Sequence, residues 1–133
     1  MIICVDFDGT IVDHRFPEIG APVPGAIKWM KRLNKYGAKL ILYTMRSDSA
    51  LFTTALSEAL EYLRKEGVEL YGVNENPTQK SWTVSPKVNA DVYVDDLAFG
   101  CPLIFPKGFA RPCADWSEIG PELERMCLSR GKT

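Results

Sequence analysis

The sequence predicts an α/β fold, a three-layer α/β/α sandwich built on a central parallel sheet. Short, largely apolar segments alternate along the chain with longer segments whose apolar residues recur at helical spacing. The first short segment, residues 2–5, is entirely apolar, as expected for a strand that is covered on both faces. Two of the short segments, residues 2–5 and 91–94, are each followed by paired acidic residues. This order is that of a Rossmann-like domain, in which ligands bind at the carboxyl ends of the strands.

The strands of this sheet are separated by one irregular stretch and by helices. Residues 11–23 contain two prolines and a glycine, so we expect no regular structure there. Residues 78–90 are polar and are also expected to form a loop. Strands are predicted at residues 2–5, 39–43, 68–73 and 91–94.

Three helices are expected, each with a recognisable start. The second begins at Arg46, where Ser47 or Asp48 can accept hydrogen bonds from the first-turn N–H groups. The last begins at Pro121, after residues 115–118, which resemble a capping box. The helices are predicted at residues 24–36, at residues 46–66 and from Pro121 onward.

Length and composition predict one ordinary globular domain over residues 1–133. Lys and Arg total 16 and Asp and Glu total 17, so the net charge of −1 provides no general attraction to nucleic acid. No segment approaches the ~18 consecutive apolar residues of a membrane span, and we expect no secretory leader. The four cysteines form no Cys-x-x-Cys pair, and we expect a reduced, cytoplasmic protein. They are Cys4, Cys101, Cys113 and Cys127.

A first pair of carboxylates, Asp6 and Asp8, follows the first predicted strand. Side chains alternate along an extended chain, so the two carboxylates can point the same way from the strand end. Two adjacent carboxylates repel unless a cation lies between them, and Mg²⁺ suits such oxygen ligands. The simpler interpretation is a turn, in which Asp8 and Gly9 are only good turn formers.

The segment Asp6-Phe7-Asp8-Gly9-Thr10 resembles the opening motif of the haloacid dehalogenase superfamily of phosphotransferases. The resemblance implies that Asp6 is the nucleophile that becomes an aspartyl phosphate. It implies that Asp8 is the general acid/base, which protonates the leaving oxygen and then activates water. The turn that contains Gly9 and Thr10 is expected to orient the phosphoryl group through its N–H groups.

Later segments resemble the other motifs of the same superfamily. Thr44 ends the second strand and resembles the hydroxyl residue that binds the transferring phosphoryl group, and Met45 and Arg46 beside it are expected to contact substrate. Asp95 and Asp96 resemble the fourth motif. With Asp6 and the backbone carbonyl of Asp8, they are expected to complete a Mg²⁺ site.

The lysine that neutralises the nucleophile and the phosphate is assigned less directly. Lys87 precedes Asp95 by eight residues, a short spacing similar to that of capless phosphatases of the superfamily. Lys80 is the substitute. His14, the only histidine, and Arg15 lie in the irregular stretch without an assigned role.

The resemblance covers residues 6–96 and implies a Mg²⁺-dependent phosphomonoester hydrolase without a cap domain. Residues 11–23 and 74–90 are too short to form a cap, so we expect an open site that takes a sugar phosphate, a nucleotide or a larger phosphorylated molecule. A second copy of the chain is a candidate to cover that site. Two alternatives stay open, a receiver-like phospho-acceptor and a catalytically inactive binding module. The receiver is disfavoured because its phosphate-accepting Asp ends a mid-chain strand, where this chain has Thr44.

Overall fold

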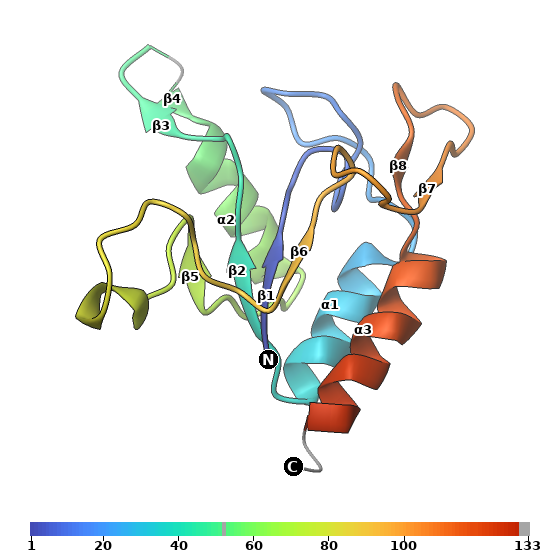
Figure 1. Cartoon of the computed structure of the whole chain (residues 1–133). Helices are drawn as coiled ribbons and strands as arrows, with labels where there is room; N and C mark the ends of the chain where they lie inside the picture. The colour runs from blue at the N-terminus through green and yellow to red at the C-terminus, as the bar shows by residue number, and fades with distance from the viewer. Residues whose placement is uncertain (52, 131–133) are drawn as a thin grey trace.

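The computed structural model, which describes residues 1–51 and 53–130, contains a four-stranded parallel sheet (Figure 1). The strands lie in the order β5-β2-β1-β6, with β1 at Ile2–Val5, β2 at Lys39–Leu42, β5 at Gly72–Val73 and β6 at Val92–Val94. Cys4 in β1 lies opposite Ile41 in β2 and Tyr93 in β6. The chain segments that follow β1, β2 and β6 therefore meet at one edge of the sheet, and the predicted parallel α/β class is confirmed.

All three helices pack on one face of this sheet. They are α1 (Ala26–Lys35), α2 (Ala55–Lys65) and α3 (Trp116–Arg130). Alternate strand residues point toward them and share one buried core with the inward residues of the helices. The strand side of this core is Ile3, Val5, Leu40, Leu42 and Val94, and the helix side includes Met30, Leu33, Ala59, Leu63 and Leu123.

The opposite face of the sheet is covered by the connection between β5 and β6. Cys4 and Ile41 point to that face and form a second buried cluster with Val88. The connection contains one short 3₁₀ helix, η1 (Gln79–Ser81). The predicted third layer is therefore this polar segment rather than a long helix, because the segment lacks an apolar stripe at helical spacing.

The second helix begins later than predicted. A short strand β3 (Asp48–Ser49) pairs antiparallel with β4 (Thr53–Thr54), and α2 starts only at Ala55. Asp48 nevertheless caps the helix, because its Oδ1 accepts hydrogen bonds from Leu56 N (3.1 Å) and Ser57 N (3.0 Å). Of the two predicted capping residues, Ser47 and Asp48, it is Asp48 that caps the helix, and the predicted start at Arg46 is wrong.

The last helix begins earlier than predicted, at Trp116, and Pro121 lies inside it. Asp115 caps it by accepting hydrogen bonds from the N–H (3.1 Å) and the hydroxyl (2.6 Å) of Ser117. The Trp116 indole is fully buried and donates to Thr10 O (2.8 Å), which joins α3 to the loop after β1. A second antiparallel pair, of β7 (Leu103–Ile104) and β8 (Cys113–Ala114), precedes the helix.

Two further features of the structure concern membrane-spanning helices and the state of the cysteines. Within the described residues, no helix combines the length and the apolar character that crossing a bilayer requires. The four cysteines are free thiols in this structure. Cytoplasmic location remains a prediction.

Candidate active site

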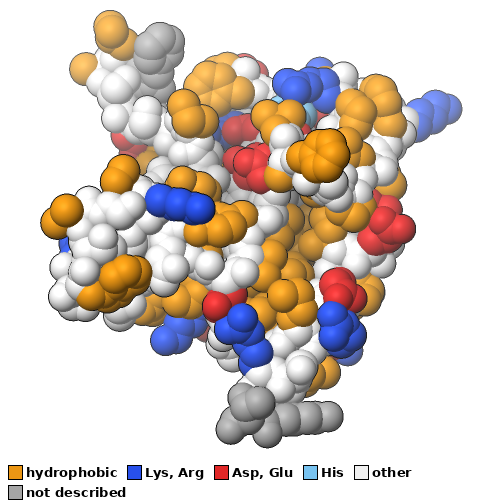
Figure 2. All heavy atoms as spheres, in the orientation of Figure 1, with side chains coloured by type: hydrophobic (Ala, Val, Ile, Leu, Met, Phe, Trp, Pro, Cys, Tyr) orange, Lys and Arg blue, Asp and Glu red, His pale blue; other side chains and the backbone are white. Residues whose placement is uncertain are grey.

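Three carboxylates meet at the edge of the sheet where the strands end. Asp6 follows β1, and Asp95 and Asp96 follow the neighbouring strand β6. One ligand oxygen from each lies within 4.8 Å of the others. Figure 2 shows acidic side chains gathered in the upper middle of the molecule. The structure thus brings together the first and fourth motifs, which are separated by about 90 residues of sequence.

The charges of this acidic cluster are unbalanced. Burial, together with the negative charges of Asp95 and Asp96, raises the pKa of the Asp6 carboxyl from 3.8 to about 8. Among the described residues, no basic side chain contacts Asp6 or Asp95. Three such carboxylates are jointly ionised only when a cation lies among them, and their hard oxygen ligands fit Mg²⁺.

Asp96 is held in place from two sides. Its N–H donates to Thr10 Oγ1 (3.1 Å), which also lies 3.2 Å from Asp96 Oδ1, and its Oδ2 lies 2.8 Å from His14 Nε2. Gly9 makes this approach possible, because a Cβ on Gly9 would lie 2.0 Å from His14 Nε2 and 2.3 Å from Asp96 Oδ2. His14, which had no role in the sequence interpretation, is a positioning residue for the acidic cluster.

The predicted contacts of Gly9 and Thr10 with the phosphoryl group stay predictions, and in this structure both residues are bonded within the protein. Both residues are buried, and their N–H groups donate to Val12 O (2.7 Å) and Phe7 O (3.2 Å). The Thr10 hydroxyl is hydrogen-bonded to Asp96 and lies 3.5 Å from Asp6 Oδ2. In this structure neither residue has a free donor for substrate, and both build the turn that carries the carboxylates.

Arg46 and Asp8 form a bidentate ion pair in which the arginine side chain is buried and Asp8 is half-buried. Arg46 Nε donates to Asp8 Oδ2 and Arg46 Nη2 to Asp8 Oδ1, each at 2.9 Å. The guanidinium is 2% exposed and lies over the rings of Phe7 (4.9 Å) and Phe16 (5.3 Å). Both oxygens of Asp8 therefore accept hydrogen bonds from one cation, in the bidentate geometry of an arginine–carboxylate pair.

The predicted contact of Arg46 with substrate stays a prediction, and in this structure the guanidinium is bonded within the protein. Its remaining N–H groups donate to the carbonyls of Pro17 (3.0 Å), Glu18 (2.7 Å) and Ala55 (3.1 Å). With the two bonds to Asp8, all five guanidinium donors are in use. Arg46 joins the turn after β1, the irregular stretch and the start of α2, and in this structure it has no donor left for a phosphate.

Thr44 and Met45 lie beside the acidic cluster at the end of β2. Thr44 N–H donates to Asn74 Oδ1 (2.8 Å), and Thr44 Oγ1 accepts from Arg46 N (3.1 Å), so its hydroxyl proton is available to another acceptor. Met45 is 97% exposed at the rim. Their contacts with substrate stay predictions.

Two lysines, Lys87 and Lys80, are candidates for the lysine of the site. Lys87 Nζ lies 5.7 Å from the centroid of the Tyr93 ring, and Lys80 Nζ lies 3.2 Å from Glu75 Oε2. Within the described part of the chain, neither lysine forms an ion pair with the acidic cluster. Lys87 remains the prediction, with Lys80 as its substitute.

The sequence interpretation missed Asp13. This carboxylate is 1% exposed and accepts from His14 N (2.8 Å) and Ala110 N (2.9 Å), while Arg15 Nε lies 3.4 Å from it. Arg15 also donates to Gly108 O (3.3 Å). These contacts hold the irregular stretch against the loop before β8. Only one feature of the sequence pointed to Asp13, its place directly after two apolar residues.

A solved structure resembles the whole chain. A conserved protein coded by a locus of Bacteroides thetaiotaomicron superposes with a TM-score of 0.75 at 34% sequence identity, over 95% of this chain and 91% of that one. The chain belongs to the family of that protein.

A D,D-heptose 1.7-bisphosphate phosphatase from B. bronchiseptica, solved with magnesium and phosphate, is similar over 54% of this chain and 47% of its own. Its TM-score is 0.42 and its sequence identity to this chain is 18%. No protein-family model and no curated protein matches the chain.

Proposed function

We propose that the protein is a Mg²⁺-dependent phosphomonoester hydrolase of the haloacid dehalogenase type, with Asp6 as the nucleophile. The convergence of Asp6, Asp95 and Asp96 at the carboxyl edge of a parallel sheet carries this proposal. A half-buried carboxylate with acidic neighbours and, among the described residues, no basic partner is unfavourable for folding and suits a site that works with a bound cation. The resemblance of residues 6–10 to the superfamily's first motif supports the same function.

The residues present fit a magnesium ion. Asp6, Asp95 and Asp96 would hold it, and the backbone carbonyl of Asp8 is a further candidate ligand. Bound there, Mg²⁺ supplies positive charge to the carboxylates and to the oxygens of the transferring phosphoryl group.

Asp6 attacks phosphorus in line, an O–P bond forms to its carboxylate, and the bond to the leaving oxygen breaks. Asp8 gives a proton to that oxygen and later takes one from the water that cleaves the aspartyl phosphate. Both Asp8 oxygens accept hydrogen bonds from Arg46. This arrangement suits the second step, in which Asp8 takes a proton from water. The first step requires one Asp8 oxygen to leave the guanidinium and take up a proton. The free hydroxyl proton of Thr44 donates to the phosphoryl group.

The proposed enzyme has no cap domain. In the described chain, the segments between β1 and α1 and between β5 and β6 contain no helix longer than η1. An open site of this kind admits the substrate from solvent, and a second copy of the chain remains a candidate to cover it. The receiver-like alternative is less well supported because the paired acidic residues follow β1 and β6, whereas Thr44 follows β2.

Hydrolysis of p-nitrophenyl phosphate tests this function. Wild type with Mg²⁺ is expected to release p-nitrophenol, and EDTA or Asp6→Asn to lower kcat by about 10³-fold or more. Asp91→Asn is the matched control, because Asp91 lies at the opposite end of β6 and its oxygens accept from Ile2 N and Arg130. Activity that survives in Asp6→Asn, or that is unaffected by EDTA, would contradict the proposal.

A further inference from the structure

Asn74 has an unusual backbone conformation. It directly follows β5, and among the described residues it is the one non-glycine residue with a positive φ, +54°. A side chain makes this left-handed conformation unfavourable, and asparagine is one of the residues that tolerate it best. Such a conformation persists only where surrounding contacts hold it, and it is found most often at functional positions.

This conformation ends β5 and turns the chain sharply back on itself. A Cβ on Gly72 would lie 2.3 Å from Glu75 O, so the turn closes over a position where only glycine fits. Asn74 N still donates to Leu42 O (2.7 Å), which extends the pairing of β5 with β2 by one residue. The next N–H on this side of β2, that of Thr44, therefore lies beyond the end of β5.

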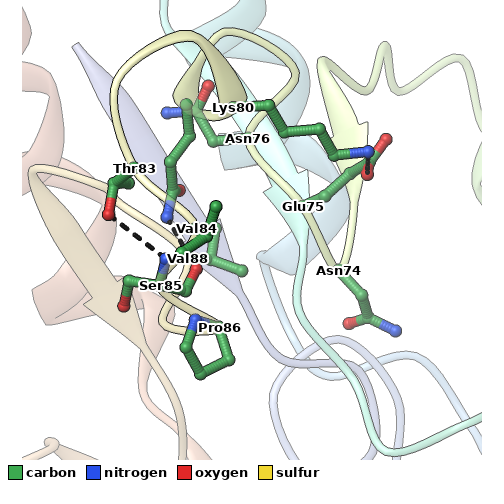
Figure 3. A pocket seen from close by; sticks show the side chains of 10 residues that line it. Asn74, Glu75, Asn76, Lys80, Thr83, Val84, Ser85, Pro86 and Val88 are labelled. Carbon is green, nitrogen blue, oxygen red and sulfur yellow. Dashed lines mark hydrogen bonds and ion pairs between the residues drawn. The ribbon is translucent and has the colours of Figure 1, made fainter.

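The side chain of Asn74 replaces the strand carbonyl that β5 no longer supplies. Its Oδ1 accepts from Thr44 N (2.8 Å), and because a backbone N–H can only donate, the amide oxygen is the atom that faces Thr44. Figure 3 shows the Asn74 side chain at the edge of a cavity of about 480 Å³, pointing away from Glu75 and Lys80. The amide is therefore directed to the end of β2 and not into the cavity.

Thr44 is consequently held at two of its atoms. Its N–H is bonded to Asn74, and its Oγ1 accepts from Arg46 N (3.1 Å). The first contact fixes the backbone from which the side chain of Thr44 projects, and the second occupies one lone pair of the hydroxyl oxygen. Together they limit the directions in which the hydroxyl proton of Thr44 can point.

We infer that Asn74 is a positioning residue for Thr44, and that the Asn74 amide keeps the Thr44 hydroxyl aimed at the transferring phosphoryl group. The inference rests on the proposed function for the role of that hydroxyl. In the described chain the Asn74 side chain is bonded to Thr44 and not to the acidic cluster, so its effect on the reaction passes through Thr44. The two residues should therefore be energetically coupled.

A double-mutant cycle tests this coupling. Asn74→Gly removes the amide and suits the left-handed backbone, and Thr44→Val removes the hydroxyl while it keeps the shape of the side chain. Asn74→Gly is expected to lower kcat/KM for p-nitrophenyl phosphate by about 5- to 10-fold in wild type, and by less than about twofold in Thr44→Val. Equal losses in the two backgrounds would show that Asn74 does not act through Thr44, and would overturn the inference.

Amide hydrogen exchange tests the contact without turnover. Asn74→Gly is expected to speed exchange at Thr44 several-fold, whereas Asn74→Asp, which keeps an acceptor oxygen and tolerates a positive φ, leaves it close to wild type. Asn89→Gly is the matched control, because Asn89 is exposed and lies before β6, at the end opposite the acidic cluster. This control should change neither exchange at Thr44 nor activity. Unchanged exchange at Thr44 in Asn74→Gly would overturn the inference.

The two proposals fail in different ways. A wild type that does not hydrolyse p-nitrophenyl phosphate contradicts the proposed function, and the exchange rates then still decide whether Asn74 holds Thr44. An active wild type whose Asn74→Gly variant keeps full activity contradicts the inference alone.

Discussion

Asp8 and Asp6 are two carboxylates at the same edge of the sheet with opposite electrostatic surroundings. Asp8 is neutralised by the guanidinium of Arg46, whereas Asp6 has acidic neighbours and a pKa raised to about 8. The difference arises because Arg46 folds back onto Asp8, and Asp6 therefore depends on a bound cation for its charge.

Arg46→Lys separates a positioning role from phosphate binding. Lysine keeps the charge but cannot make the bidentate contact or the three carbonyl contacts. We expect kcat for p-nitrophenyl phosphate to fall by about 10²-fold with little change in KM, and the free energy of unfolding to fall by about 3 kcal/mol. Steady-state kinetics and urea unfolding measure the two effects.

Arg64→Lys is the control for this variant, because Arg64 makes an exposed ion pair with Glu61. It is expected to change neither quantity measurably. A large rise of KM in Arg46→Lys with kcat unchanged would show that Arg46 binds the phosphate after all.

Gly9, in the turn after β1, and Gly37, after α1, are two glycines with the same backbone conformation and different surroundings. Their φ angles are +86° and +87°, but a Cβ at Gly9 would collide with His14 and Asp96, and one at Gly37 would meet nothing within 4 Å. Gly37→Ala should cost about 1 kcal/mol of unfolding free energy through strain alone. Gly9→Ala should cost about 3 kcal/mol or more and weaken Mg²⁺ binding measured by calorimetry. Equal losses in the two variants would be inconsistent with the close approach of His14 to Asp96.

At the scale of elements, the sheet was predictable and the helix boundaries were less so. Residues 2–5 and 39–42 are strands as expected, because a continuous apolar run is a local property of the sequence. The start of α2 was misplaced because Ser, Thr and Asp between residues 47 and 54 also favour turns and short strands. The pairing of β3 with β4 is a contact that helical periodicity does not report.

In the candidate site, too, the features that depend on local sequence were predicted, and the contacts between residues distant in sequence were not. Asp6, Asp95 and Asp96 were grouped correctly because each follows an apolar strand, and parallel strands end at one edge. The partners of Arg46 and Thr10 were missed because they are distant in sequence. Asp8 is 38 residues from Arg46, and Asp96 is 86 residues from Thr10.

The cap of α2 gives a prediction at this scale. Asp48 accepts from Leu56 N, Ser57 N and the Ser57 hydroxyl, and these contacts lower the pKa of the Asp48 carboxyl. Asp48→Ala should therefore speed amide hydrogen exchange at Leu56 and Ser57 several-fold, while exchange in α1 stays unchanged. Unchanged exchange at Leu56 and Ser57 would show that Asp48 does not cap the helix.

At the scale of the molecule, the acidic cluster links stability to pH. The Asp6 carboxyl keeps its proton to about pH 8 in the folded, metal-free protein and loses it near pH 4 when unfolded. The folded state thus binds more protons between these values, and the free energy of unfolding falls as pH rises through this range.

Thermal unfolding in EDTA between pH 4 and pH 8 measures this linkage. Wild type should lose stability with rising pH, and Asp6→Asn should be more stable than wild type at pH 8 by about 1–2 kcal/mol, roughly 5 °C in Tm. Addition of Mg²⁺ should stabilise wild type at pH 8 and should affect the variant less. A wild-type Tm that rises from pH 4 to pH 8 in EDTA would contradict the unbalanced charge of the cluster.

The central claim, that Asp6 becomes phosphorylated during turnover, is tested most directly by chemical trapping. Enzyme quenched during hydrolysis of p-nitrophenyl phosphate is treated with borohydride, which reduces an aspartyl phosphate to homoserine, and the peptide that contains residues 1–10 is analysed by mass spectrometry. The proposal predicts homoserine at position 6, dependent on both Mg²⁺ and substrate. Active enzyme with an unmodified Asp6, or with homoserine at another aspartate, would contradict it.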